Sequence, residues 1–241
     1  EVSCHDIKLN TTIDIIIDSE IVFLCVPTPQ GDDGSCDTSI IISVLKELSE
    51  KGYTGIVAIK STVECGFTQT AIDDYTNLTL CFVPEFLRER CALDDFIHNH
   101  NLLAVGTHDK FVFDKLVEAH GHYPKDTVKL KPTEAEILKY YNNVFAAYKI
   151  IFANIMSEVC GKLNCDYTTV KDAFIKFGRC KDTYLDVNEN LKGYGGMCLP
   201  KDVKAMTKLL EKLNIDFDTF KSIDKDNSKL KTTVFNGMRK R

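Results

Sequence analysis

Apolar runs of strand length alternate with stretches of helical spacing over the first 130 residues, and this alternation limits the fold more than any other feature. Four stretches have an apolar centre, which is typical of strands buried on both faces: residues 19–29, 55–62, 78–86 and 101–107. Helical spacing separates or follows them over about 38–50, 68–75 and 109–119, and the short stretch DTVKL, 126–130, comes last. This order predicts an α/β fold with a parallel sheet covered by helices on both faces.

The first six residues, EVSCHD, alternate in polarity and end in an acid, which predicts a further short strand. In a dinucleotide-binding fold, the acid that ends the second strand holds the ribose hydroxyls, so Asp6 is a candidate for that role. A helix cap or a solvated acid is the alternative for Asp6. No Gly-x-Gly-x-x-Gly is present in the 241 residues. We expect the first strand, the glycine turn and the first helix, roughly 30 residues, to precede Glu1.

The pattern changes after Pro132. The letters PTEAE predict a capping box with Thr133 as N-cap and Glu136 at the third helical position. Helical spacing then continues to about residue 162, which corresponds to a connecting helix of roughly 45 Å. Further helices are predicted at about 167–176, 201–213 and 217–229. We therefore expect a Rossmann-like domain over 1–131 and an all-helical central domain over 132–241.

Charge and cysteine content exclude several classes of function. The net charge is −5 and the basic residues cluster only in the last five positions, so nucleic acid is not an expected partner. No uninterrupted apolar run reaches the roughly 18 residues of a membrane span, so no membrane partner is expected. The ten cysteines contain no Cys-x-x-Cys pair, and several lie in apolar runs. These features predict reduced thiols, a cytoplasmic setting and no metal.

Polar residues follow several predicted strands, at the edge where open α/β sheets bind ligands. Thr28 and Thr62 follow two of the strands, although turn residues commonly occupy such positions. PEFLRE, residues 84–89, places two acids four apart around an arginine, and the alternative is a solvated helix start. Lys139 and Asn143 are four apart and therefore share one face of the long helix, unless they are simply solvated.

One cysteine, Cys198, lies between a glycine-rich bend and a predicted helix start in GYGGMCLPKD, residues 193–202. The N-terminus of a helix favours thiolate over thiol, and glycines allow the main chain to approach a ligand closely. The stretch therefore indicates a nucleophile, with ordinary loop chemistry as the alternative.

Taken together and in order, these stretches resemble the UDP-glucose/GDP-mannose dehydrogenase family. The resemblance spans Glu1 to about Asn227 and is most specific in PEFLRE and GYGGMCLPKD. It implies an NAD-dependent enzyme that oxidises the 6-hydroxymethyl group of a nucleotide sugar to a carboxylate in two steps, with UDP-glucose as the favoured substrate. It also implies a homodimer built around helix 133–162.

The resemblance implies particular roles for residues at matching positions. Cys198 would attack the aldehyde stage and form a thiohemiacetal and then a thioester. Asp202 would assist the thiol or the water, while Lys139 and Asn143 would contact the reacting oxygen. Thr62 and Glu89 would place the hydrolytic water and supply the base. The implied substrate-binding set is Glu85, Phe86, Leu87, Arg88, Glu89, Lys139, Asn143, Gly195 and Arg179. The implied NAD-binding set is Asp6, Thr28, Thr62, Glu89 and Lys201.

Departures from the family pattern keep other functions open. Met197 replaces a small or polar neighbour of the cysteine, LDVNENLK lacks the usual proline and aromatic residues, and Arg179 is several residues out of register. GDP-mannose or a UDP-N-acetylated sugar is an alternative substrate. A non-catalytic binding or assembly module is the alternative from another class, because the glycine turn and a third, C-terminal domain are absent from these 241 residues.

Overall fold

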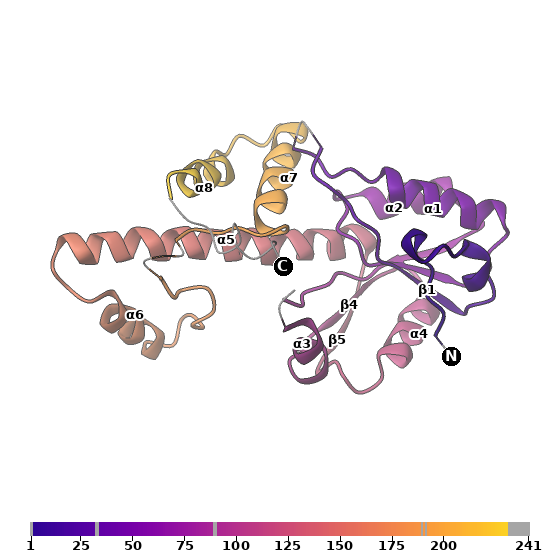
Figure 1. The fold of residues 1–241 in the computed structure, drawn as a ribbon, viewed down its shortest axis with the longest axis horizontal. Coiled ribbons are helices and arrows are strands. Elements are labelled where there is room, and N and C mark those ends of the chain that lie inside the picture. The colour runs from indigo at the N-terminus through magenta and orange to yellow at the C-terminus, as the bar shows by residue number, and fades with distance from the viewer. Residues whose placement is uncertain (1, 32–33, 89–90, 189, 191, 231–241) are drawn as a thin grey trace. The chain divides into compact units, whose positions relative to one another are not determined.

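The computed structural model describes residues 2–31, 34–88, 91–188, 190 and 192–230. The chain forms two compact units, Glu1–Lys139 and Tyr140–Arg241. The first unit is an α/β sandwich and the second is helical (Figure 1). Each unit is described in turn.

The first unit is built on a five-stranded sheet in the order β1-β2-β3-β4-β5. Its strands are β1 (Ile21–Leu24), β2 (Ile56–Ile59), β3 (Thr79–Phe82), β4 (Leu103–Gly106) and β5 (Thr127–Leu130). The first three strands are mutually parallel, and so are β4 and β5. The prediction of a parallel sheet is confirmed for these pairs, but β4 runs antiparallel to β3, with Phe82 opposite Gly106. The connection between them carries only the seven-residue helix α3 (Ala92–His98) and does not form a parallel crossover.

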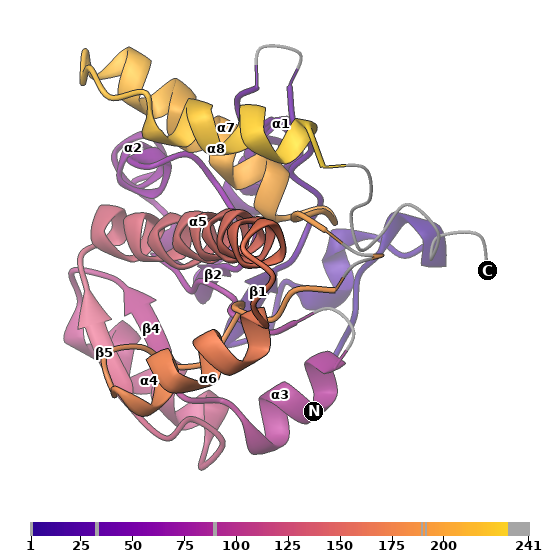
Figure 2. The same cartoon turned by 90° about the vertical axis from the view of Figure 1, so that its left-hand side faces the viewer.

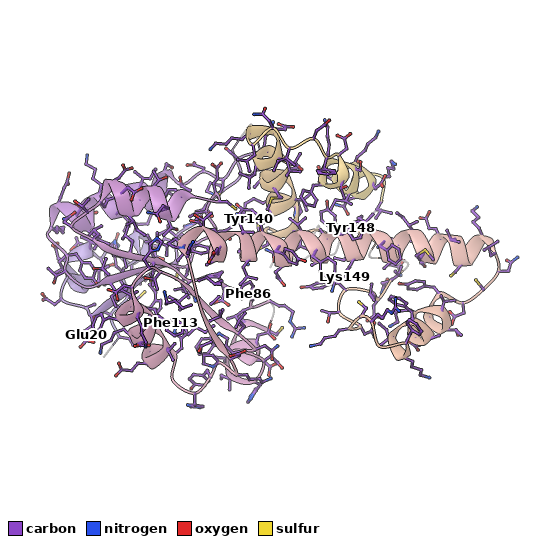
Figure 3. The ribbon with its side chains drawn as sticks, turned by 180° about the vertical axis from the view of Figure 1, so that it is seen from behind. Glu20, Phe86, Phe113, Tyr140, Tyr148 and Lys149 are labelled. Carbon is purple, nitrogen blue, oxygen red and sulfur yellow. The ribbon has the colours of Figure 1, made fainter. Side chains whose placement is uncertain are left out.

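Helices cover both faces of the sheet, as the apolar strands predict. Helix α1 (Ser39–Glu50) buries Ile41, Leu45 and Leu48 in one core, to which α2 (Phe67–Asp74) also contributes. Helix α4 (Lys110–His120) buries Val112 and Leu116 in a second core, with Phe113 packed against it. Figures 1 and 2 show α1 and α2 on the opposite face of the sheet from α4, and Figure 3 labels Phe113.

The predicted strand over EVSCHD is wrong, because residues 2–6 have no regular secondary structure. Asp6 instead caps the short 3-10 helix η1 (Ile7–Leu9), with its Oδ1 accepting from the Lys8 N–H at 2.8 Å. A second 3-10 helix, η2 (Ile13–Ile16), follows. A short acidic side chain readily bonds the main chain two residues ahead, and this local cap competes with strand formation.

The long predicted helix is confirmed as α5 (Pro132–Lys162), which starts in the first unit and continues through the second. Its 31 residues correspond to roughly 46 Å. In the second unit α7 (Leu199–Lys212) and α8 (Thr219–Ser228) pack along it, on the side opposite α6 (Tyr167–Lys176) (Figure 2). Val144 and Ile151 of α5 share a core with Val203 and Ile223.

The predicted capping box at the start of α5 is wrong by two residues. The helix begins at Pro132, the position where a fixed φ and a missing N–H are tolerated best. Glu134, not Glu136, closes the box by accepting from the Lys131 N–H at 2.8 Å. Glu136 is fully buried and caps another helix. Its two carboxylate oxygens accept from the main-chain N–H groups of Gly66 and Thr68, at 2.5 and 2.7 Å, at the start of α2.

Much of the apolar surface of α5 remains exposed in this chain. By length and composition α5 is long and apolar enough to cross a membrane, and no other helix of the described residues is. The core helix of a soluble protein meets the same criterion, and α5 packs against α7 and α8. Its exposed large apolar side chains recur at steps of four or three residues, which alternate from Tyr141 onward, at Ile137, Tyr141, Phe145, Tyr148, Phe152, Ile155 and Val159. Figure 3 labels Tyr148 on this helix.

Candidate active site

The carboxyl ends of β1 and β2 bring together two of the predicted residues, Thr28 and Thr62. The Ser61 hydroxyl donates to the Val26 carbonyl at 2.7 Å and so fixes the two strand ends to each other. The buried Cys36 thiol lies 3.2 Å from the Thr62 carbonyl and 4.0 Å from that of Thr28. Thr28 and Thr62 therefore border one edge of the sheet.

Glu85, which follows β3, has both carboxylate oxygens engaged. Oε2 pairs with Lys60 Nζ at 3.1 Å, while Oε1 accepts from the Phe86 and Leu87 N–H groups at 2.8 and 3.0 Å. Burial alone would raise the pKa of Glu85. The Lys60 charge and these hydrogen bonds outweigh burial and lower it. Glu85 is therefore an ionised group that shapes its own loop.

Lys139 is nearly buried, and its ammonium group donates to the main-chain carbonyl of Glu85. Nζ also lies 5.7 Å from the centroid of the Phe86 ring, which Figure 3 labels. The alternative of a solvated lysine is therefore wrong. The ammonium group is instead held beside the loop that the sequence marks for substrate binding.

Arg88 is directed toward Asp95 of α3. Its Nε and Nη2 atoms contact the two carboxylate oxygens at 2.9 and 2.6 Å, and its main-chain N–H adds a third bond. These donors hold the pKa of Asp95 well below its usual range. The pairing occupies the guanidinium group that we expected to face substrate. Glu89 lies outside the described residues.

In the second unit, Asp202 and Asn143 form a buried pair. Asn143 Nδ2 donates to Asp202 Oδ2 at 2.6 Å, and Lys201 Nζ lies 3.3 Å from Oδ1. The Asp202 side chain is fully buried and Asn143 nearly so. Asn142 donates to Asn143 Oδ1 at 2.9 Å and thereby fixes the amide orientation. The structure therefore brings three predicted residues, Asn143, Lys201 and Asp202, into one polar cluster.

Cys198 is exposed and occupies the N-cap position of α7, as the sequence predicts. Its carbonyl accepts the Asp202 N–H at 2.9 Å, so the carboxylate residue comes one turn after the thiol. Gly195, before the cysteine, is half-buried. The next glycine, Gly196, has a φ of 80°, in the left-handed region that favours glycine. A helix start, an exposed thiol and a flexible approach together suit a nucleophile.

The glycine bend before Cys198 is attached to α8 by Asn227. The Asn227 amide accepts from the Tyr194 N–H at 2.8 Å and donates to the Tyr194 carbonyl at 2.9 Å. Gly193 has a φ of 75°, and a Cβ there would lie 2.5 Å from Asn227 Oδ1. Only glycine fits this position without a shift.

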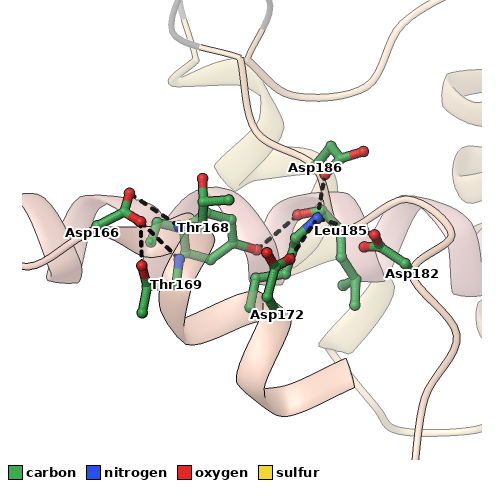
Figure 4. Close-up of polar contacts among 9 residues, drawn as sticks. Asp166, Thr168, Thr169, Asp172, Asp182, Leu185 and Asp186 are labelled. Atoms are coloured by element: carbon green, nitrogen blue, oxygen red, sulfur yellow. Dashed lines mark hydrogen bonds and ion pairs between the residues drawn. The ribbon is translucent and has the colours of Figure 1, made fainter. Parts of the chain in front are cut away.

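Further upstream, a buried lysine holds the segment that leads into the bend. Lys171 of α6 contacts Asp182 at 3.1 Å and Asp186 at 2.6 Å, with Asp172 at 3.6 Å (Figure 4). These carboxylates raise the pKa of Lys171. Arg179, in the loop between α6 and Asp182, is exposed. It stacks on Phe177, with 5.0 Å between the guanidinium carbon and the ring centroid.

Sequence reasoning missed the partners that hold these groups. Among these partners, Lys60 was the easiest to predict from the sequence, because it directly follows a buried strand. Asp95, Lys171 and Asn227 act across 7 to 33 residues of sequence, and no local pattern marks them.

Comparison with known families finds matches to both the N-terminal and the C-terminal part of the chain. Residues 1–122 match the NAD binding domain of the UDP-glucose/GDP-mannose dehydrogenase family, and residues 133–229 match its central domain. The chain belongs to this family. Residues 1–122 therefore belong to an NAD-binding domain, and NAD is the cofactor.

Individual dehydrogenases are similar across most of the chain. The UDP-glucose 6-dehydrogenase AglM of Haloferax volcanii is 32% identical over 83% of this chain and 50% of that protein. The GDP-mannose 6-dehydrogenase of Pseudomonas aeruginosa is 28% identical over 92% of this chain and 54% of its own length. A UDP-glucose dehydrogenase structure from Pyrobaculum islandicum has a TM-score of 0.81 and 29% identity, covering 90% of this chain and 52% of that one. The chain spans about half the length of the relatives it matches.

The edge formed by β1 and β2 fits NAD, because dinucleotides bind beyond the carboxyl ends of parallel strands. Thr28 and Thr62 lie there, joined through Cys36. Asp6 fits less well than predicted. It follows no strand, and one of its carboxylate oxygens is engaged as a cap.

Proposed function

We propose that the protein oxidises the 6-hydroxymethyl group of a nucleotide sugar to a carboxylate, and that the sugar is UDP-glucose. The observation that carries the proposal is the buried Asn143–Asp202–Lys201 cluster, one helical turn from the exposed Cys198. A fully buried carboxylate with an amide and an ammonium partner is costly to maintain, which supports a functional role for the cluster. Several similar proteins carry the name UDP-glucose 6-dehydrogenase, which favours that sugar.

The thiol of Cys198 supplies the nucleophile. When bound, NAD accepts the hydride lost in each oxidation. Cys198 Sγ bonds to the carbonyl carbon of the aldehyde stage and so retains it as a thiohemiacetal. The later thioester is cleaved by water, which returns the free thiol. The role of moving a proton to or from the thiol or the water is assigned to Asp202, whose carboxylate accepts from Asn143.

Lys139 and Asn143 stabilise the reacting oxygen. An ammonium group held in a nearly buried position is preorganised for developing negative charge. Thr62 and Glu89 place the hydrolytic water, and Glu89 serves as base. Lys201 contributes to NAD binding along with Asp6, Thr28, Thr62 and Glu89. The nucleotide sugar is bound by the loop that Glu85 organises, by Gly195 and by Arg179.

The exposed apolar residues of α5, Ile137 to Val159, form a stripe along the helix, and this stripe supports a homodimer. Six of its members, from Tyr141 to Val159, follow the four-three spacing of a coiled-coil seam. A helix that is apolar on two faces needs a second partner besides α7 and α8. We further propose a cytoplasmic setting, because all ten cysteines are free thiols.

The function is tested by NADH absorbance of the full-length protein with UDP-glucose, GDP-mannose and a UDP-N-acetylated sugar. We expect two NADH per UDP-glucose consumed and a sugar acid as product. Preferential turnover of GDP-mannose would correct the substrate. No turnover of any of these sugars, with NAD bound, would favour the binding-module alternative.

A Cys198→Ser variant tests the covalent step separately. We expect sugar-acid formation to be abolished while NAD binding, followed by quenching of protein fluorescence, is nearly unchanged. Cys180→Ser is the matched control, because it removes a thiol from the same unit without touching the helix start. Normal carboxylate formation by Cys198→Ser would contradict the mechanism.

A further inference from the structure

Helix α5 ends in a turn that brings its last cysteine against the next one along the chain. Asn164 has a φ of 54°, which reverses the main chain just after the helix. The Cys165 N–H donates to the Cys160 carbonyl at 2.9 Å, and the Asn164 N–H donates to that of Gly161 at 3.3 Å. These are the two hydrogen bonds of a Schellman motif, in which Cys160 and Cys165 occupy positions C3 and C″.

The side chains at C3 and C″ of such a motif commonly make an apolar contact, and here both are thiols. The Cys165 thiol lies 3.5 Å from the Cys160 carbonyl. Cys160 is buried, with 5% of the residue exposed, whereas Cys165 is exposed. Burial raises the pKa of Cys160, and a hydrogen bond with the Cys165 thiol raises it further. One sulfur is therefore open to solvent and the other is held behind it.

The geometry of the turn suits a covalent link. A main-chain hydrogen bond between the two residues holds their Cα atoms close, as a disulfide requires. Two other buried thiols, Cys36 and Cys81, lie instead against the main-chain carbonyls of Thr62 and Val57. We propose that Cys160 and Cys165 form a dithiol modification site that reacts with small-molecule disulfides and closes to an intramolecular disulfide.

The reaction balances in two exchanges. The exposed Cys165 thiol loses its proton, and the thiolate attacks one sulfur of the oxidant, whose S–S bond breaks. The first small thiolate leaves and takes up that proton. Cys160 then loses its proton and attacks Cys165 Sγ, releasing the second small thiol. Two protein thiols are oxidised by two electrons, and the oxidant is reduced to two thiols. The proposal is independent of the dehydrogenase function.

The disulfide would lock the turn from which α6 departs. Asp166, the next residue, caps α6 through the N–H groups of Thr168 and Thr169, as Figure 4 shows. Tyr167 then donates to the Leu185 carbonyl at 2.8 Å. The modified turn is therefore followed directly by residues that hold the segment before the glycine bend in place.

The test is peptide mapping of the full-length protein after incubation with oxidised glutathione, followed by alkylation and trypsin. Cleavage after Lys149, Lys162 and Lys171 separates the two cysteines into IIFANIMSEVCGK and LNCDYTTVK. We expect these two peptides to be joined by a disulfide, and a thiol reductant to separate them. Two results would overturn the proposal: a glutathione adduct that persists on Cys165, or a link from Cys165 to another cysteine.

Two variants and a second probe sharpen the result. Cys160→Ala should convert the cross-link into a stable glutathione adduct on Cys165, whereas Cys180→Ser should leave the cross-link unchanged. Phenylarsine oxide tests proximity without oxidation, since it condenses with two thiols and releases water. The Cys198→Ser protein should retain one equivalent on this pair, and the added Cys165→Ser change should lose it. Equal retention by both proteins would contradict the pairing.

Discussion

Glu136 provides the most direct test of how the start of α5 is fastened within the first unit. Its carboxylate is the acceptor for two main-chain N–H groups that begin α2, those of Gly66 and Thr68. The first N–H groups of a helix have no partner within the helix. Replacing Glu136 with alanine would therefore remove one acceptor and leave two donors in a largely buried place.

The expected loss of stability follows from that count. A buried donor left without a partner costs about 1–3 kcal/mol, and two of them give about 2–6 kcal/mol. The variant also gains something, because the chain no longer buries a carboxylate. We therefore expect a loss of about 3 kcal/mol in the free energy of unfolding for Glu136→Ala.

Urea unfolding, followed by circular dichroism, measures this difference. Glu134→Ala is the matched control, since Glu134 lies in the same helical turn but is exposed and accepts the Lys131 N–H. Losing this cap should cost roughly 0.5–1 kcal/mol. Equal losses for the two variants, or a loss below about 1 kcal/mol for Glu136→Ala, would refute the assignment of Glu136 as the cap of α2.

The same group makes a prediction about pH. Burial raises the pKa of Glu136 above its ordinary 4.5, and the Gly66 and Thr68 donors offset this only in part. The folded chain then binds the proton more tightly than the unfolded chain. The protonated Glu136 therefore contributes to the free energy of unfolding. This contribution is complete below the unfolded pKa and is lost as pH rises from about 4.5 through the folded value. The difference in unfolding free energy between wild type and Glu136→Gln should therefore fall across this window and be level above it.

Three further variants test the candidate site, the dimer and the segment that leads into the glycine bend. Lys139→Ala should lower turnover by about 100-fold, equivalent to roughly 3 kcal/mol of barrier, with little change in NAD affinity; turnover within about twofold of wild type would leave Lys139 a structural residue. Phe145→Glu should convert the dimer to a monomer in light scattering, because it places a charge in the exposed stripe, and an unchanged mass would contradict that interface. Lys171→Met should release Asp182 and Asp186 and speed trypsin cleavage after Lys181, and an unaltered cleavage rate would show that the ion pairs do not hold this segment.

The main elements of the fold were predictable because their signals are local. Buried strands such as Ile56–Ile59 are apolar at every position, and α1 and α4 bury residues at helical spacing. The direction of β4 was not predictable, because it depends on how the chain returns after α3 and not on the letters of the strand. Asp6 and Glu136 were misplaced for a related reason: each has several donors within reach, and tertiary structure decides among them.

The candidate site divides in the same way. Cys198 and Asp202 were identifiable from one stretch, since a single helical turn relates them. Asn143 could be assigned to a face of α5, but its hydrogen bond to Asp202 spans 59 residues of sequence. Arg88 shows the limit most clearly. The family resemblance implied a substrate-binding role for it, whereas its pairing with the nearby Asp95 could not be read from the sequence.

The two apolar faces of α5 restrict how the length of this helix can change. One face carries Val144 and Ile151 into the core, and the other carries Phe145 and Phe152 outward. A single inserted residue turns all that follows by about 100°, and would exchange core for surface along the rest of the helix. An insertion of seven residues restores both faces to within about 20°. Homologous helices should therefore differ in length by seven or eleven residues, which nearly restore both faces, or not at all.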